Sequence, residues 1–314
     1  MRAPRLRTLA AALCLSALVG GLTACTDDDS TSNGNGPAAR DKATRAAVDQ
    51  ALHEALPQRV RTAGKLVVVM PGVNPPWWKK DGSRYTGAAA ELTERLGEVL
   101  GVRMEYVPVN DLAGAFAAVA SGRYDAGFNP YGDTGKATNV ELVDVVREIV
   151  PFLVPRGNPK KINTLGDMCG RSVAALGPAG MGSAYQVLTD QSKTCVKEGK
   201  KAVNIVPLKS VPEGVLAVKS RRADAFFASG APLSFYAAGS DGALELAGKE
   251  SANGFDNLYQ GMILPVKSPL TPTVLAAFQK LFDNGEYERI MKQHGLTDQL
   301  IDAPGVDLAR KPGK

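Results

Sequence analysis

Four cysteines carry the most informative chemistry of the chain, and their positions indicate three different roles. Cys14 lies within an apolar N-terminal stretch, and Cys25 stands at the end of that stretch. Cys169 and Cys195 form a separate pair in the second half of the chain. We expect this pair to form a disulfide if the protein leaves the cytoplasm, because an even pair of cysteines is typical of oxidising compartments. Two buried free thiols are the alternative.

Histidines and further cysteines are too scarce to favour a metal site. Neither Cys169 nor Cys195 has a second cysteine or a histidine at the short spacing of zinc ligands. The two histidines of the chain, His53 and His294, lie far from both in sequence. We therefore expect no metal and no cofactor.

The first 24 residues are typical of a secretory signal peptide. Residues 1–7 carry three arginines and no acid, and residues 9–24 are apolar or small and uncharged. This is the order of the two regions of a signal, and its apolar part is short for a membrane-spanning helix, which needs ~20 residues. The run Leu22-Thr23-Ala24-Cys25 resembles the lipobox of bacterial lipoproteins, in which the cysteine thiol is lipidated and the chain is cut just before it. The alternative is an ordinary signal, cut at the same place, that leaves a free thiol.

Residues 25–40 form an acidic stretch rich in Ser, Gly and Asn, which is typical of a flexible tether. We expect acyl chains to hold the mature chain on the outer face of the cell membrane. Loss of the three arginines of the signal lowers the formal net charge from +5 to +2. A nearly neutral chain without a clustered basic stripe gives no reason to expect nucleic-acid binding.

Beyond the tether, periodic apolar residues predict an N-terminal helix and then alternating strands and helices. The helix lies within 41–63, and Pro57 ends its main part. β-Branched runs such as "KLVVVM" predict strands that are buried on both faces. The expected strands are 65–70, 103–109, 124–129, 172–176, 202–208, 223–229 and 257–265, and the expected helices are 86–102, 111–123, 181–199, 211–222, 270–283 and 286–296.

This alternation indicates parallel strands joined by crossover helices, and therefore an α/β fold. The pattern occurs twice. The run "VASGRYDAGF" in the first half and the run "VKSRRADAFF" in the second have similar residue types in the same order. Each run consists of a helix end, a small or basic turn, an aspartate and a strand. We therefore expect two α/β units of similar order.

Five segments between residues 65 and 296 carry a family resemblance. They are "GKLVVVMPGVNPPWWKKDGSRYTGAAAELTERLGEVLGV", "LAGAFAAVASGRYDAGF", "CGRSVAALGPAGMGS", "VKSRRADAFFA" and "FDNGEYERIMKQHGL". In this order they resemble the extracellular solute-binding proteins of ABC importers, most closely the polar-amino-acid-binding family with the type II periplasmic-binding-protein fold. The resemblance implies two lobes, each a mostly parallel sheet flanked by helices, joined by two crossover hinge strands near 148–154 and 259–264. Lobe one would comprise 64–150 plus 265–314, and lobe two 151–264.

The resemblance also implies a function. Such a protein binds a small polar solute, such as an amino acid or a related amine or zwitterion, between its lobes and delivers it to an ABC permease in the membrane. We accordingly expect a monomer that catalyses nothing. One alternative is a ligand sensor for a membrane receptor, and another is a dehydratase-like enzyme on the same fold. An enzyme needs a poised acid or base, for which the cleft loops offer Asp133, Lys136 and Glu213 at most.

Three loops at the carboxyl ends of expected strands provide the candidate ligand contacts, because ligands of α/β proteins bind at that edge. The first loop is "GVNPPWW" and the second is "NPYGDTG". In the first loop, the rings of Trp77 and Trp78 are suited to stack on a flat or cationic ligand, although Trp78 could instead fill a gap between loops. The third loop, "GPAGMGS", opens a helix and offers backbone N–H groups to an anion, or its glycines serve only the tight turn. The candidate ligand-binding residues are Trp77, Trp78, Asn129, Tyr131, Thr134, Lys136, Gly180, Met181, Ser183 and Ser229.

Two positions that hold an α-amino acid in the family differ here. The family usually has an arginine three residues after a threonine, whereas Thr134 is followed at that distance by Ala137, and counting back from the run "VELVDVV" places Lys136 there. The alternative is that Lys136 is a solvated loop residue. A lysine lacks the planar fork with which arginine binds a carboxylate. The family also has an aspartate where the uncharged Ser229 or Gly230 stands. We infer a ligand other than a standard α-amino acid. One option is a cation or flat polar solute held by Trp77, Trp78, Asn129 and Tyr131.

Overall fold

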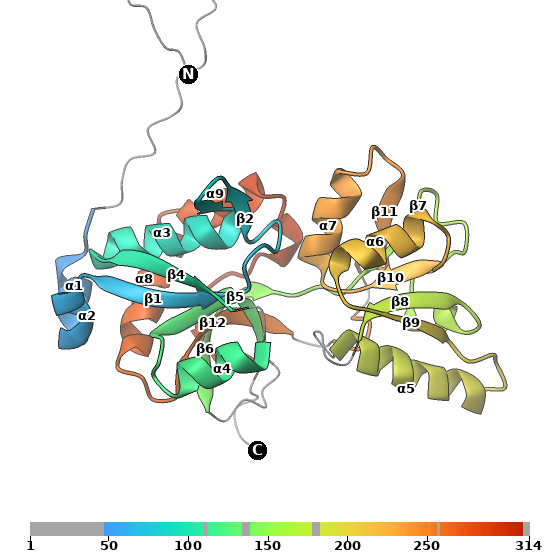
Figure 1. Cartoon of the computed structure of the whole chain (residues 1–314), viewed down its shortest axis with the longest axis horizontal. Coiled ribbons are helices and arrows are strands. Elements are labelled where there is room, and N and C mark those ends of the chain that lie inside the picture. Colours follow the sequence, from blue (N-terminus) through green and yellow to red (C-terminus); the bar gives the residue numbers. More distant parts are fainter. Residues whose placement is uncertain are drawn as a thin grey trace, which may run out of the picture. The chain divides into compact units, whose positions relative to one another are not determined.

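The computed structural model of the chain describes residues 47–109, 112–133, 139–177, 183–250, 252–255 and 258–309. Residues 45–314 form one compact unit. The expected signal peptide, Cys25 and the tether up to residue 40 lie outside the described residues. The compact unit contains two large β-sheets, sheet one and sheet two, with helices on their faces (Figure 1). No helix in the described ranges is long and apolar enough to cross a membrane.

Sheet one has six strands in the order β13-β6-β12-β5-β1-β4. β1 is parallel to β4 and β5, whereas β12 runs antiparallel between β5 and β6, and β13 pairs with β6. The bounds are Lys65–Met70 for β1, Arg103–Pro108 for β4, Ala126–Asp133 for β5, Val140–Arg147 for β6, Tyr259–Pro265 for β12 and Gly305–Val306 for β13. The sequence analysis assigns most of β12 to lobe two and to a crossover, but its pairing places it in sheet one over its whole length.

Helices cover both faces of sheet one, because successive residues of a strand point to opposite faces. Val68 of β1 belongs to a core cluster with residues of α3, α8 and α9. The next residue, Val69, belongs to a second cluster with Ala115 and Val119 of α4. The bounds are Ala88–Leu100 for α3, Leu112–Ala120 for α4, Leu270–Asp283 for α8 and Glu286–Gln293 for α9.

The N-terminal helical region packs against sheet one as two short helices, α1 (Gln50–Ala55) and α2 (Gln58–Ala63). Pro57 separates them and is the N-cap of α2. Asp49, the N-cap of α1, accepts a hydrogen bond from the backbone N–H of Leu52 and pairs with Lys280 of α8 at 2.7 Å. Arg59 of α2 pairs with the carboxylate of Asp125, which precedes β5. The sequence-based expectation of one main helix ending at Pro57 therefore misses the second helix.

Sheet two has five strands in the order β11-β7-β10-β8-β9. β8 is parallel to β9 and β10, and β7 is antiparallel to β10 and β11. Leu188 and Cys195 of α5 pack on one face, and Val215 of α6 and Leu233 of α7 pack on the other. The bounds are Phe152–Pro155 for β7, Ser172–Leu176 for β8, Asn204–Leu208 for β9, Ala225–Phe227 for β10, Leu244–Ala247 for β11, Ser183–Lys197 for α5, Val211–Lys219 for α6 and Gly230–Ala238 for α7.

Smaller elements complete the described chain. A two-stranded hairpin follows the loop after β1, and two short 3-10 helices lie before β8 and after α9. Residues 148–151 connect sheet one to sheet two, and the chain returns to sheet one at β12 (Figure 1). The bounds are Lys79–Asp81 for β2, Arg84–Thr86 for β3, Leu165–Met168 for η1 and Thr297–Gln299 for η2.

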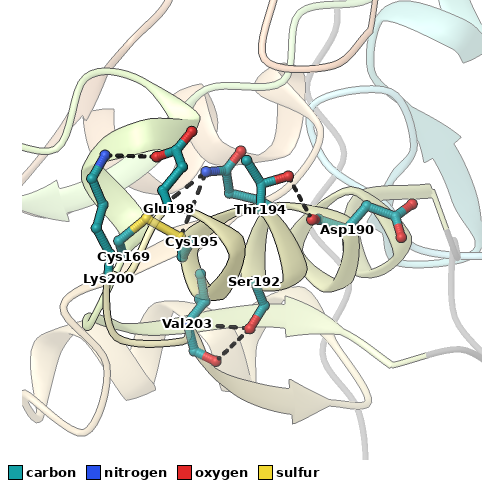
Figure 2. The surroundings of a disulfide bond; sticks show 9 residues. Cys169, Asp190, Ser192, Thr194, Cys195, Glu198, Lys200 and Val203 are labelled. Carbon is teal, nitrogen blue, oxygen red and sulfur yellow. Dashed lines mark hydrogen bonds and ion pairs between the residues drawn. A yellow bond between two sulfur atoms is a disulfide. The ribbon is translucent and has the colours of Figure 1, made fainter.

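A disulfide joins Cys169 and Cys195, as the sequence predicts (Figure 2). Cys169 directly follows η1, Cys195 lies in the last turn of α5, and their Cα atoms are 5.6 Å apart. Cys195 is fully buried in the core of sheet two. The bridge therefore ties the segment before β8 to the helix that covers one face of the sheet. Within the part of the chain that the structure describes, no group of His, Cys, Asp or Glu side chains could hold a metal ion.

Replacing both cysteines by alanine should lower the free energy of unfolding. The bridge spans 26 positions, and in the chain-entropy model a loop of this size contributes ~3 kcal/mol by restricting the unfolded chain. Urea unfolding followed by far-ultraviolet circular dichroism measures the difference. Dithiothreitol should lower the stability of the wild type and leave Cys169→Ala/Cys195→Ala unchanged. Equal stability of the oxidised wild type and the variant would contradict this expectation.

Candidate functional site

The candidate site lies where the edges of the two sheets are joined by the crossover. In sheet one the carboxyl ends of β5 and β6 lie at the same edge, because Tyr259 of β12 is opposite both Asp133 and Arg147. In sheet two Phe227, at the carboxyl end of β10, is opposite Phe152, at the start of β7. The crossover therefore leaves sheet one and enters sheet two at the edges where parallel strands end. Ligands of α/β proteins bind at such edges.

Five of the ten residues expected from the sequence to bind ligand have described side chains. They are Trp77, Trp78, Asn129, Tyr131 and Ser229. Thr134, Lys136, Gly180 and Met181 lie outside the described residues, and so does the side chain of Ser183, the first residue of α5.

Trp78 belongs to the core of sheet one. The side chain has no exposed surface, and its indole N–H donates a hydrogen bond to the backbone carbonyl of Phe128 at 3.0 Å. Its ring packs edge-on against the rings of Tyr85 and Tyr106, with centroids 6.1 and 5.0 Å away. Trp77 is also buried, with 2% of its surface exposed. The packing of Trp78 fits the alternative in which it fills a gap between loops, and this ring offers no face to a ligand.

Asn74, in the loop after β1, and Asn129, within β5, form a polar pair. The side-chain amide of Asn74 donates to the side-chain carbonyl of Asn129 at 3.0 Å. The backbone of Asn74 also exchanges two hydrogen bonds with that of Trp78, which closes the loop after β1. Asn129 is among the residues expected from the sequence, whereas Asn74 is not. Its partner lies 55 positions away, and no local pattern shows such a contact.

Tyr131 turns its ring towards α4. The ring packs edge-on against Phe116 at a centroid distance of 5.5 Å, and 3% of the residue is exposed. The hydroxyl has no hydrogen-bond partner among the described residues. Burial raises the pKa of this hydroxyl above its ordinary value, so the group stays protonated and keeps its capacity to donate.

Glu148 is a residue of the site that the sequence analysis misses. Its Oε2 atom accepts hydrogen bonds from the hydroxyl of Ser229 at 2.5 Å and from the side-chain amide of Gln260 at 2.6 Å. Its Oε1 atom accepts from the backbone N–H groups of Gly230 at 3.2 Å and Ile149 at 3.0 Å. Burial raises the pKa of the carboxyl to about 7, and the hydrogen bonds oppose this shift. The carboxyl group of Glu148 is thus in direct contact with the hydroxyl of Ser229, at the crossover.

A pocket of about 600 Å³ lies at the same crossover. Glu148 lines it together with four other charged residues and five neighbours that are uncharged. Two of the charged residues come from different parts of the chain and form an ion pair, in which Nζ of Lys249 lies 2.5 Å from a carboxylate oxygen of Asp298. The other two charged residues are Arg147 and Glu250.

A second group of carboxylates fastens the C-terminal segment to β6. Asp144 accepts the backbone N–H of Leu308 at 2.8 Å, and Asp133 accepts that of Ala309 at 3.1 Å. Asp307 in turn accepts the backbone N–H of Leu142 at 3.0 Å. Burial, aided by the nearby charge of Asp133, raises the pKa of Asp144 to about 8. These contacts give Asp133 a structural role.

The residues available for catalysis are correspondingly few. Of the three cleft residues considered as a catalytic acid or base, Lys136 lies outside the described residues and Asp133 holds the C-terminal segment. Glu213 caps the first turn of α6 together with Ser210, and its carboxylate accepts the backbone N–H of Lys209 at 3.2 Å. Asp133 and Glu213 therefore each hold backbone groups in place.

Residues 66–297 match the family model of the bacterial extracellular solute-binding proteins, family 3. The chain belongs to this family. It is similar to the arginine-binding protein ArgT of Corynebacterium glutamicum, with 28% identity over 246 residues, which cover 75% of this chain and 76% of that protein. Members of the family are solute-binding proteins, and the sequence-based resemblance to a polar-amino-acid-binding family is confirmed.

Several solved structures share the fold of this chain. The ancestral amino acid-binding protein AncCDT-1, a precursor of cyclohexadienyl dehydratase, matches with a TM-score of 0.61 and 20% identity over 75% of this chain and 97% of that one. An ancestral arginine-binding protein bound to arginine matches with a TM-score of 0.58 and 22% identity over 74% of this chain and 98% of that one. The predicted two-lobe α/β fold of the type II periplasmic binding proteins is thereby confirmed.

Substituting Trp78 with phenylalanine should destabilise the protein. The change removes the hydrogen bond to the buried carbonyl of Phe128 and leaves a small cavity, at a combined cost of about 1–3 kcal/mol. Urea unfolding of Trp78→Phe and wild type measures the loss. An unchanged unfolding midpoint would show that the indole is outside the core.

Substituting Asp144 with asparagine should change how stability depends on pH. Because the folded-state pKa of Asp144 is raised from 3.8 to about 8, the stability that this carboxyl contributes is complete below pH ~4 and is lost as the pH rises through 8. Asparagine does not titrate, so Asp144→Asn should gain on the wild type by on the order of 1–3 kcal/mol between pH 5 and 8.5.

Thermal unfolding at several pH values measures this gain. Asp81→Asn, which removes an exposed carboxylate of β2, should follow the wild type throughout. A constant difference between Asp144→Asn and wild type across this range would contradict the expected titration.

Proposed function

We propose that this protein is the substrate-binding component of an ABC importer. It captures a small polar solute between its two lobes, and a cationic amino acid such as arginine is the first candidate. The closed form delivers the solute to a membrane permease. The family match over residues 66–297 is the observation that carries the proposal, because it includes sheet two, all of sheet one except β13 and the first residue of β1, and the crossover between the sheets.

The choice of a cationic ligand has two supports. One is the similarity to a protein named for arginine binding, although 28% identity leaves room for a different ligand. The other is the local charge, because a buried carboxylate lies behind Ser229 at the crossover. This choice modifies the sequence-based inference of a ligand other than a standard α-amino acid, since arginine is both an α-amino acid and a cation.

The anchor forms a second part of the proposal. We propose that the mature chain begins at a lipidated Cys25 and that residues 25–40 tether it to the outer face of the cell membrane. Support comes from the apolar run that ends at "LTAC" and from the polar composition that follows it. The lobes are then sheet one and sheet two, each with its helices, and the protein acts as a monomer.

A soluble form that lacks residues 1–25 should be stabilised by cationic amino acids. Residues 45–314 form one compact unit, so removal of the N-terminal segment leaves the site complete. A ligand that binds only the folded state adds ~2.7 kcal/mol of stability at a hundredfold excess over its Kd. A thermal-shift panel of amino acids, betaines, polyamines, small sugars and nucleosides measures this stabilisation, and isothermal titration calorimetry then gives the affinity. A shift with sugars or nucleosides alone would contradict the proposal.

A further inference from the structure

The hydroxyl of Ser229 already has a partner that determines what else it can bind. Ser229 follows β10 and is the N-cap residue of α7, but its side chain makes no capping hydrogen bond. Instead, the hydroxyl donates to Oε2 of Glu148 at 2.5 Å. The residue is only partly buried, so it keeps accessible surface at the carboxyl edge of sheet two.

Glu148 is held in place from three parts of the chain. Gln260 belongs to β12 of sheet one, Gly230 belongs to α7 of sheet two, and Ile149 is the next residue of the crossover. With Ser229, these residues supply four donors. A carboxylate has about four lone-pair positions, so Glu148 has no position left for a direct bond to a ligand. In its ionised state it is a negative charge held in place, and the residue is 5% exposed.

This arrangement makes Ser229 an acceptor. A serine hydroxyl has one proton to donate and two lone pairs to accept with. Because the proton points to ionised Glu148, only the lone pairs remain for a ligand. Hydrogen bonds that involve a charged group are shorter and about twice as strong as neutral ones. The charge behind the hydroxyl therefore favours a ligand group that is both an N–H donor and a cation.

We propose that Glu148 and Ser229 act as one unit that receives a cationic N–H group of the ligand, an ammonium or a guanidinium. Ser229 makes the contact, and Glu148 is a positioning residue that orients the hydroxyl and supplies the charge. The proposal rests on the proposed function and deepens it, because it assigns the charge at a position where the chain has an uncharged residue. It also gives the site a defined chemical preference.

The protonation state of Glu148 sets the direction of the Ser229 hydroxyl. A protonated Glu148 can donate to Ser229, and the hydroxyl is then free to donate to a ligand. The pKa of Glu148 is raised by burial to about 7, so both states are reached near neutral pH. The donors that face the carboxyl come from Ser229, Gly230, Gln260 and Ile149. The other charged residues of the same pocket are Arg147, Lys249, Glu250 and Asp298.

Calorimetry with L-arginine tests the unit in the soluble form that lacks residues 1–25. At pH 8, Glu148→Gln and Ser229→Ala should each weaken binding by about tenfold or more, because each removes a charge-assisted hydrogen bond. The double variant should bind no more weakly than Glu148→Gln alone, because the two residues act together. Ser229→Thr keeps the hydroxyl and should restore binding to within about threefold of wild type.

Two controls separate the role of Glu148 from general effects. Asp81→Asn removes an exposed carboxylate of β2, outside this pocket, and should leave the affinity within about threefold of wild type. Wild-type affinity for L-arginine should increase from pH 6 to pH 8, and Glu148→Gln should lose this increase. L-Citrulline, whose side chain is uncharged, identifies the group that is received: weaker citrulline binding by Glu148→Gln assigns the ammonium, and unchanged binding assigns the guanidinium.

Several results would overturn the inference and leave the proposed function intact. One is that Glu148→Gln binds L-arginine as tightly as the wild type does. Another is that the losses of affinity in the two single variants add up in the double variant. A third is that the wild type binds only uncharged or acidic amino acids. If no amino acid binds the wild type, the proposed function fails, and a ligand-free measurement decides the pairing. Ser229→Ala should then raise the pKa of Glu148, read from the carboxyl carbon signal that Glu148→Gln lacks. An unchanged pKa would overturn the pairing as well.

Discussion

The insertion of β12 between β5 and β6 is the constraint on which the rest of the structure depends. The chain leaves sheet one after β6, builds sheet two, and returns to the middle of sheet one. Gly261 makes the close pairing possible, since a Cβ atom there would lie 2.1 Å from the carbonyl oxygen of Val143. The return also brings α8 onto the core, where Phe278 packs against Phe128 of β5. Both connections between the sheets therefore lie at one edge, and Gln260 meets Glu148 there.

The elements with a strong local pattern could be predicted from the sequence. The β-branched run of β1 and the apolar stripe of α3 match the structure closely. β6, β11, β13 and α7 were not predicted. α7 is apolar on several faces, so its sequence lacks helical periodicity. β13 has two residues and depends on pairing with β6, which no local signal encodes.

The residues of the candidate site could likewise be predicted only in part from the sequence. The pairing of Cys169 with Cys195 could be predicted from the sequence, because the number and positions of the cysteines are visible in one chain. The sequence could not identify Glu148, because the residues that bond to its side chain lie 81 and 112 positions away. Trp78 was proposed for ligand stacking because of its residue type. Its contacts with Tyr106 and the carbonyl of Phe128 place it in the core.

The location of Glu148 matters as much as its charge. A buried carboxylate is costly unless hydrogen bonds satisfy it, and here the two sheets and the crossover between them supply those bonds. Asn74 and Asn129 belong to sheet one alone, and Ser229 belongs to sheet two. Under the proposed function, a charge in the crossover would stay close to the pivot as the lobes close, so it would attract a cation in the open form and support Ser229 in the closed one.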